Sequence, residues 1–170
     1  MARLTRLEKL LFRLEAQYLC LAWAFKEVSE RPGVVFELGL GHGRTYDHMR
    51  ERLPGRDIYV FDRELDCFDD CVPPDDRLFL GDIGDTLTAA AQRFRRKVVL
   101  AHCDMGAYST QHNEAMSDLL SQQLPAVLAP AAIVLSDLPL DMPGARALPL
   151  PAGARDGRYF VYRAGPGFHG

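Results

Sequence analysis

Apolar residues recur at alternating steps of three and four positions along the first 30 residues of the chain. This spacing places them on one face of an amphipathic helix, and it predicts a long helix over residues 4–30. The apolar positions of this face are Leu4, Leu7, Leu11, Leu14, Tyr18, Leu21, Phe25 and Val28. Arg31-Pro32-Gly33 ends the helix, because proline and glycine are the residues least compatible with a helix interior.

From residue 33 onward, short runs rich in β-branched and aromatic residues alternate with helical patterns. Such runs are typical of buried strands. Five of them are "VVFELGL", "DIYVFD", "DRLFLGD", "KVVLAHCD" and "AAIVLSD". Helices are expected between them at about 44–53, 85–95 and 110–128, the second with Asp85 as its N-cap.

Two more strand-like runs, "ARALPL" and "GRYFVYRA", close the chain on either side of a polar turn. They predict a hairpin. The whole pattern therefore predicts an α/β fold: a doubly wound, mostly parallel seven-stranded sheet with a C-terminal antiparallel hairpin, preceded by a long N-terminal helix.

Length and composition favour one domain over residues 1–170, with the helix over 1–30 and a Rossmann-like core over 33–170. A net charge of -3 with interspersed signs offers no basic stripe for nucleic acid, so no such partner is expected. The four cysteines form no CxxC motif, and we recognise no signal peptide or membrane-length apolar run. A cytoplasmic protein without membrane contact is the expectation.

A glycine-rich loop follows the first predicted strand, in "ELGLGHGRT". Open parallel sheets bind ligands beyond the carboxyl ends of their strands. Glycines there let the backbone approach a ligand, and the helix that follows directs free N–H groups at an anion. A dinucleotide fingerprint requires G-x-G-x-x-G, but Arg44 occupies the place of the third glycine. The spacing is G-x-G-x-G instead.

The segment Glu37-Leu38-Gly39-Leu40-Gly41-His42-Gly43 resembles motif I of the class I S-adenosylmethionine-dependent methyltransferases, an acidic residue followed by G-x-G-x-G. Asp62, at the end of the second strand, matches the acidic residue that binds the ribose hydroxyls in that family. Gly81-Asp82-Ile83 resembles the family's adenine site, with the acidic side chain on the exocyclic amine and Ile83 packed on the base.

The resemblance implies S-adenosyl-L-methionine as the cofactor. The residues expected to bind it are Glu37, Gly39, Gly41, Gly43, Arg44, Thr45, Asp62, Arg63, Asp82, Ile83 and Asp104. In this interpretation the three glycines clear space for the methionine end of the cofactor, and Arg44 and Thr45 lie near its carboxylate.

His102 and Asp104 lie where the family's catalytic motif begins, and two residues apart on a strand they face the same side. Methyl transfer is an in-line displacement, so the main task is to align the acceptor with the methyl group. We expect His102 to take a proton from a hydroxyl or amine, and Asp104 to orient the acceptor or the amino group of the cofactor. Alternatively, His102 is a satisfied histidine inside the sheet.

Three residues are expected on the substrate side: Tyr108, His112 and Asp137. Asp137 and Asp104 together have the oxygen ligands that a divalent cation prefers, as in the metal-dependent catechol-type methyltransferases. Those relatives follow the second acid with Asn, however, and here Leu138 stands in that place. No metal site is therefore predicted.

The sequence thus predicts an S-adenosylmethionine-dependent methyltransferase that acts on an O or N atom of a small-molecule acceptor, since no basic patch or docking insertion is evident. The alternatives are a non-catalytic S-adenosylmethionine-binding sensor or partner subunit, because cofactor motifs concern binding only, and, less favoured, an NAD(P)-dependent oxidoreductase. Phe12, Leu19 and Trp23 mark a second apolar face on the first helix, which predicts a homo-oligomer.

Overall fold

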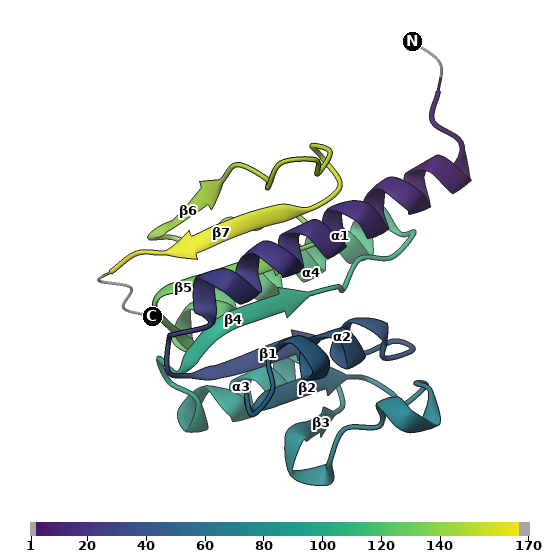
Figure 1. Cartoon of the computed structure of the whole chain (residues 1–170). Coiled ribbons are helices and arrows are strands. Elements are labelled where there is room, and N and C mark those ends of the chain that lie inside the picture. Colours follow the sequence, from purple (N-terminus) through teal and green to yellow (C-terminus); the bar gives the residue numbers. More distant parts are fainter. Residues whose placement is uncertain (1–2, 167–170) are drawn as a thin grey trace.

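The computed structural model describes residues 3–166, which form one seven-stranded sheet with helices on both faces (Figure 1). The strands are β1 (Val34–Leu38), β2 (Ile58–Asp62), β3 (Leu78–Leu80), β4 (Val98–Cys103), β5 (Leu128–Ser136), β6 (Ala145–Leu148) and β7 (Phe160–Ala164). The helices are α1 (Arg6–Val28), α2 (Arg44–Arg52), α3 (Ile83–Arg93) and α4 (Thr110–Gln123), and the short 3-10 turns are η1 (Asp69–Cys71), η2 (Asp75–Arg77) and η3 (Leu124–Ala126).

The strand order is β3-β2-β1-β4-β5-β7-β6. The first five strands in this order pair in parallel, and β7 pairs antiparallel with both β5 and β6. The predicted fold class is confirmed, including the antiparallel hairpin. Because the parallel strands all end at one edge, the segments that follow β1, β2, β3, β4 and β5 meet there.

The core lies on both faces of the sheet. One cluster of buried apolar side chains joins it to α1 and α2 and contains Leu21 and Met49. The other joins it to α3 and α4 and contains Leu87 and Leu120. No helix of the part described is long and apolar enough to cross a membrane.

The helix α1 begins after Thr5, whose side chain accepts the N–H of Glu8 at 3.2 Å in a capping box. Its C-terminal half packs on the sheet, whereas its N-terminal half extends past the carboxyl ends of the parallel strands (Figure 1). The predicted apolar face is therefore covered only in its C-terminal part. Leu7 is 74% exposed and Leu11 57%.

The second apolar face predicted for this helix contacts the chain itself. Phe12 lies under the guanidinium of Arg155, 3.5 Å from the ring centroid. Leu19 lies against Gly153, and Trp23 packs on the buried cluster beneath α1. The connection from β6 to β7 thus reaches this face, so the face that α1 leaves exposed is the one with Leu7 and Leu11.

Two predicted helix boundaries are also wrong. The third helix begins at Ile83, with Asp82 rather than Asp85 as its N-cap. The fourth ends at Gln123 instead of residue 128, because Pro125 cannot continue a helix and the chain tightens into η3 before β5 begins.

Candidate functional site

The glycine loop turns sharply after β1, and its glycines differ in how closely other parts of the protein approach them. A Cβ at Gly39 would lie 2.3 Å from the carbonyl oxygen of Asp104, and one at Gly43 would lie 2.5 Å from Cβ of Cys71. A Cβ at Gly41 would meet no atom within 4 Å. Gly39 and Gly43 thus make room for the protein itself, contrary to the prediction, and only Gly41 borders open space.

Asp62, at the end of β2, fixes this loop. Its Oδ2 accepts the N–H groups of Leu40 at 2.7 Å and of Gly41 at 3.0 Å, and its Oδ1 accepts the N–H of Arg63 at 2.6 Å. The side chain is half-buried. The N–H of Glu64 lies 3.4 Å from the same Oδ1. A carboxylate offers about four lone-pair sites, so a further donor at Asp62 would replace this long hydrogen bond.

The first two residues of α2 turn their side chains toward the protein. The guanidinium of Arg44 lies over the ring of Phe68, 5.4 Å from its centroid, and Thr45 donates its hydroxyl hydrogen bond to Glu37. The N-cap of α2 is Gly43, which has no side chain to cap the helix. An anion at this point would meet the backbone N–H groups of α2 rather than those two side chains.

The predicted adenine site lies at the start of α3. Asp82 accepts the N–H of Gly84 at 2.9 Å, and its other oxygen lies 3.7 Å from the guanidinium of Arg63. Both side chains are more than half exposed, so they border solvent. Ile83, however, is only 5% exposed and packs in the core. This burial contradicts the expectation that its side chain stacks on the base.

A row of hydrogen-bonded polar side chains lies buried beneath α1. Glu37 and His102 have no exposed surface, and Nδ1 of His102 lies 2.7 Å from the Glu37 carboxylate. The other ring nitrogen is hydrogen-bonded to the hydroxyl of Tyr159. Burial alone would lower the pKa of His102, but the Glu37 charge outweighs it and raises the pKa. Burial also raises the pKa of Glu37, with His102 opposing.

This arrangement contradicts the catalytic role predicted for His102. A side chain without exposed surface cannot touch an acceptor, and both of its ring nitrogens already have partners inside the protein. The alternative, a satisfied histidine inside the sheet, describes it correctly. His102 and Asp104 do face the same side, toward α1, since Gln17 of that helix lies within hydrogen-bonding distance of both.

Asp104 and Asp137 lie next to each other at the strand ends. Asp104 accepts hydrogen bonds from Arg13 and from Gln17, the latter at 3.1 Å. Burial acts to raise the pKa of Asp104, but the charges of Arg13 and His102 hold it below 3.8. Asp137 accepts the N–H groups of Met105 at 3.1 Å and Gly106 at 2.9 Å.

Asp137 differs from Asp104 in its ionisation. Burial raises the pKa of Asp137 to about 6, and the nearby charge of Asp104 acts in the same direction. A carboxyl with a pKa near neutrality can both accept and release a proton at physiological pH.

Beside Asp137 opens a pocket of about 800 Å³ between the N-terminal half of α1, the segment after β4 and the β6–β7 connection. Its lining residues are Arg6, Lys9, Leu10, Arg13, Gly106, Ala107, Tyr108, Asn113, Asp137, Leu138, Gly157 and Arg158. Tyr108 and Asp137, both predicted on the substrate side, are brought together here. His112 is not part of the lining; its ring nitrogen lies 3.3 Å from the carbonyl of Met105.

The sequence analysis did not identify the side chains of α1 that line this pocket. Arg6, Lys9 and Arg13 recur at steps of three and four, so they share one face of the helix. That signal was present in the sequence. The roles of Gln17 and Tyr159 left no such signal, because their partner His102 lies 85 and 57 positions away.

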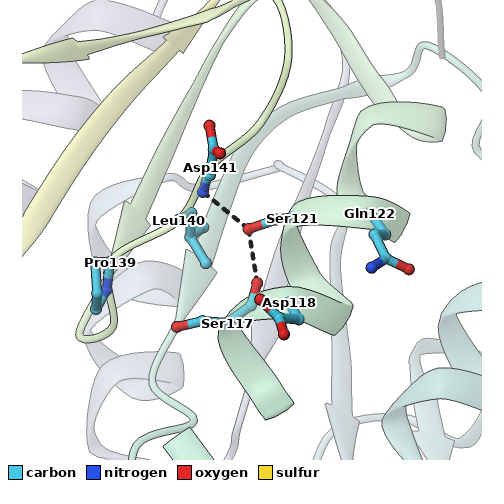
Figure 2. Close-up of a pocket in the computed structure, with 7 residues that line it drawn as sticks. All are labelled: Ser117, Asp118, Ser121, Gln122, Pro139, Leu140 and Asp141. Atoms are coloured by element: carbon cyan, nitrogen blue, oxygen red, sulfur yellow. Dashed lines mark hydrogen bonds between the residues drawn. The ribbon is translucent and has the colours of Figure 1, made fainter. Parts of the chain in front are cut away.

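Figure 2 shows a second hollow, of about 370 Å³, between α4 and the segment after β5. Here Ser121 donates to the carbonyl of Ser117 at 2.6 Å and accepts the N–H of Asp141 at 2.9 Å. None of the residues predicted to bind cofactor or substrate lines this hollow. These bonds fix the segment after β5 to α4.

No group of three or more His, Cys, Asp or Glu side chains suited to a metal ion occurs within residues 3–166. Of the two carboxylates considered for such a site, Asp104 is bonded to a guanidinium, and both oxygens of Asp137 accept backbone N–H groups.

A family model and a solved structure both match the chain over nearly its whole length. A family model described as S-adenosyl-L-methionine methyltransferase matches residues 4–164. The crystal structure of an S-adenosyl-L-methionine methyl transferase from Silicibacter pomeroyi is 39% identical in sequence, and the match covers 96% of this chain and 100% of that protein with a TM-score of 0.92. No curated protein matches the chain in sequence.

More distant structures share the fold. Human methyltransferase-like protein 13, solved with SAH, is 12% identical over 91% of this chain and 81% of its own, with a TM-score of 0.55. The MycE methyltransferase of the mycinamycin biosynthetic pathway, solved with Mg, SAH and Mycinamycin VI, is 14% identical over 91% of this chain and 48% of its own, with a TM-score of 0.56.

Proposed function

The chain belongs to the S-adenosyl-L-methionine methyltransferase family, and from this premise we propose that it transfers the methyl group to an oxygen or nitrogen atom of a small-molecule acceptor. The observation that carries the proposal is the pocket beside Asp137, whose volume of about 800 Å³ is typical of small-molecule sites. Gly106 and Asp137 of its lining follow β4 and β5, at the edge of the sheet where such folds bind ligands.

The cofactor is S-adenosyl-L-methionine, and we assign its parts to the ends of successive strands. Asp82 and the neighbouring Arg63 flank the adenine, and the Asp62 carboxylate receives the ribose hydroxyls. The methionine end lies at Gly41, the one loop glycine that borders open space. Its carboxylate meets the uncapped N–H groups of α2, and its amino group faces Asp104.

The acceptor gives up a proton, and we assign that proton to Asp137. In the reaction the acceptor lone pair forms a bond to the methyl carbon while the carbon–sulfur bond breaks, so S-adenosylhomocysteine leaves and the acceptor loses one proton. With a pKa of about 6 and a place in the pocket lining, Asp137 is suited to receive it. His102 supports the site from beneath by fixing Glu37, which in turn holds Thr45 at the start of α2.

The fold itself is compatible with a small acceptor. MycE, which shares it, has been solved with the small molecule Mycinamycin VI. Within the present chain, the pocket is bounded by residues of α1 and of the β6–β7 connection.

Turnover with small acceptors tests this proposal. Release of S-adenosylhomocysteine is measured with a panel of small alcohols, phenols, amines and acids, and we expect at least one to be methylated. Asp137→Asn is expected to lower kcat by about 100-fold or more while the affinity for S-adenosylhomocysteine stays unchanged. Asp75→Asn, an exposed aspartate before β3, is the matched control. An Asp137→Asn enzyme as fast as the wild type would contradict the assignment.

The alternative function, a non-catalytic partner subunit that only binds the cofactor, gives a different pattern. It predicts tight S-adenosylhomocysteine binding, no methyl transfer to any acceptor, and no effect of Asp137→Asn on whatever partner it regulates.

The proposal includes self-association through α1. Leu7, Leu11, Leu14 and Tyr18 lie on its exposed side, each at least 45% exposed, and an apolar stripe of this kind favours contact with another copy. Sedimentation velocity of the wild type and of Leu7→Gln/Leu11→Gln tests it. A dimer that the double variant converts to a monomer is expected, and a monomeric wild type at micromolar concentration would contradict it.

The proposed setting is the cytoplasm, without nucleic-acid or membrane partners. All four cysteines are free, which fits a reducing compartment. The net charge of -3 disfavours binding along a polyanion.

A further inference from the structure

Four cationic side chains line the pocket beside Asp137. Arg6, Lys9 and Arg13 come from one face of α1, and Arg158 comes from the β6–β7 connection. Asp137 is the one carboxylate in the same lining. The chain as a whole carries a net charge of -3, so this cluster of positive side chains is opposite in sign to the net charge of the protein.

Three of these cations lack partners. Arg13 is bonded to Asp104, but the side chains of Arg6, Lys9 and Arg158 make no hydrogen bond, ion pair or cation–π contact with any residue in the 3–166 range. A pocket lined by unpaired charges of one sign raises the local concentration of ligands of the opposite sign. The pocket therefore favours an anion.

The same lining also has an apolar part. Leu10 and Leu138 contribute aliphatic surface, and Tyr108 presents a fully exposed ring. A ligand that fills this volume can place an apolar body against these side chains and an anionic group among the cations.

We infer that the methyl acceptor is a small molecule with a carboxylate or phosphate group on an apolar body, held by Arg6, Lys9 and Arg158. This inference rests on the proposed function, since it assumes that the pocket receives the acceptor. Guanidinium groups bind both kinds of anion through paired N–H bonds. The anionic group then lies toward the N-terminus of α1, and the atom to be methylated lies toward Asp137.

The cofactor has its own carboxylate, which is the main competitor for these cations. Arg6 and Arg13 lie seven residues apart on α1, about 10 Å along the helix axis. Arg13 is the cation next to Asp104 and hence to the glycine loop, where Gly39 touches the Asp104 backbone. The cofactor carboxylate, assigned above to the N–H groups at the start of α2, lies on the glycine-loop side of Arg13 and therefore leaves Arg6 and Lys9 for a second anion.

Titration of the S-adenosylhomocysteine-saturated protein tests the inference. The probes are benzoate, phenyl phosphate and the neutral benzamide. Their binding is measured by calorimetry or ligand-detected NMR. We expect saturable binding of at least one anion, about tenfold or more tighter than benzamide. The tighter of the two anions distinguishes a carboxylate site from a phosphate site.

Matched variants locate the binding. Lys9→Gln is compared with Lys26→Gln at the other end of α1, and Arg158→Gln with Arg146→Gln on β6; both control residues are exposed and lie outside the pocket. Each pocket variant is expected to weaken the binding of the anion by about tenfold, the usual loss of affinity for one charge-assisted hydrogen bond. The controls are expected to match the wild type.

Three results would overturn the inference: neither anion binds better than benzamide, the control variants lose as much affinity as the pocket variants, or the pocket variants lose affinity for S-adenosylhomocysteine. The last result would assign the cations to the cofactor. Affinity for S-adenosylhomocysteine is measured first and separately. Tight cofactor binding without anion binding therefore refutes the acceptor class alone, whereas a protein that does not bind S-adenosylhomocysteine contradicts the proposed function as well.

Discussion

Replacing Glu37 with alanine removes the acceptor on which two interior groups depend. Nδ1 of His102, 2.7 Å from the carboxylate, and the hydroxyl of Thr45 both lose their partner. A buried polar group without a partner costs about 1–3 kcal/mol, and the vacated side-chain volume adds to this. Breaking a buried ion pair on one side typically costs about 3–5 kcal/mol. We therefore expect Glu37→Ala to lower the free energy of unfolding by about 3–5 kcal/mol, a large part of the total for a domain of this size.

Urea unfolding at neutral pH measures this loss. The control is Glu51→Ala, an exposed glutamate on α2, which is expected to change stability by no more than about 0.5 kcal/mol. Glu37→Gln, which keeps a hydrogen-bonding group of similar shape, serves where the alanine variant does not fold. A Glu37→Ala loss below about 1 kcal/mol would refute the view that this pair organises the interior beneath α1.

The same pair predicts a pH dependence. The pKa values of Glu37 and His102 are both raised. A group whose pKa is higher in the folded protein than in the unfolded chain stabilises the fold fully at any pH below its pKa in the unfolded chain, which is 4.5 for Glu37 and 6.5 for His102. This stabilisation is lost as the pH rises through the pKa of the folded protein. The stability difference between the wild type and Glu37→Gln should therefore shrink as the pH rises above 4.5, and further as it rises above 6.5. A difference that grows with pH would show that the sign is wrong.

Two more predictions concern the loop and the pocket. Gly39→Ala places a Cβ 2.3 Å from the Asp104 carbonyl oxygen at a φ of 92°, so thermal unfolding should show a loss of stability of more than about 2 kcal/mol. Gly41→Ala makes no such contact and should lose less stability but bind S-adenosylhomocysteine more weakly. Equal losses of stability in the two variants would contradict the different roles assigned to the two glycines. Benzoate binding should strengthen as the pH falls through about 6, because Asp137 loses its charge there while the facing groups Asp104 and Arg13 keep theirs. An affinity that does not change with pH, or the same pH dependence in Asp137→Asn, would show that the Asp137 carboxyl does not control benzoate binding.

The fold was predictable because its signals are local. Each strand of the sheet is a short apolar run, and the glycine loop lies directly between one such run and a helix. Errors appeared where a distant segment decides the outcome. Whether Leu7 or Phe12 faces solvent depends on the β6–β7 connection, more than a hundred residues later in the chain.

The site was predictable in position but only partly in role. The ends of the strands place Asp62, Asp82, Asp104 and Asp137 at one edge, as expected for parallel strands. The role of His102 was not predictable, because it depends on burial beneath α1 and on Tyr159 from the far end of the chain. Nothing in the strand "KVVLAHCD" distinguishes a sealed histidine from an accessible one.

The central claim is that the cofactor binds at the glycine loop with its ribose on Asp62. Isothermal titration with S-adenosylhomocysteine tests it most directly, on the wild type, on Asp62→Ala and on the control Asp75→Ala, whose residue is exposed and precedes β3. The account predicts micromolar binding, about tenfold or more weaker in Asp62→Ala and unchanged in the control. Equal affinity in all three proteins would contradict it, because the cofactor would then lie away from the loop that Asp62 holds.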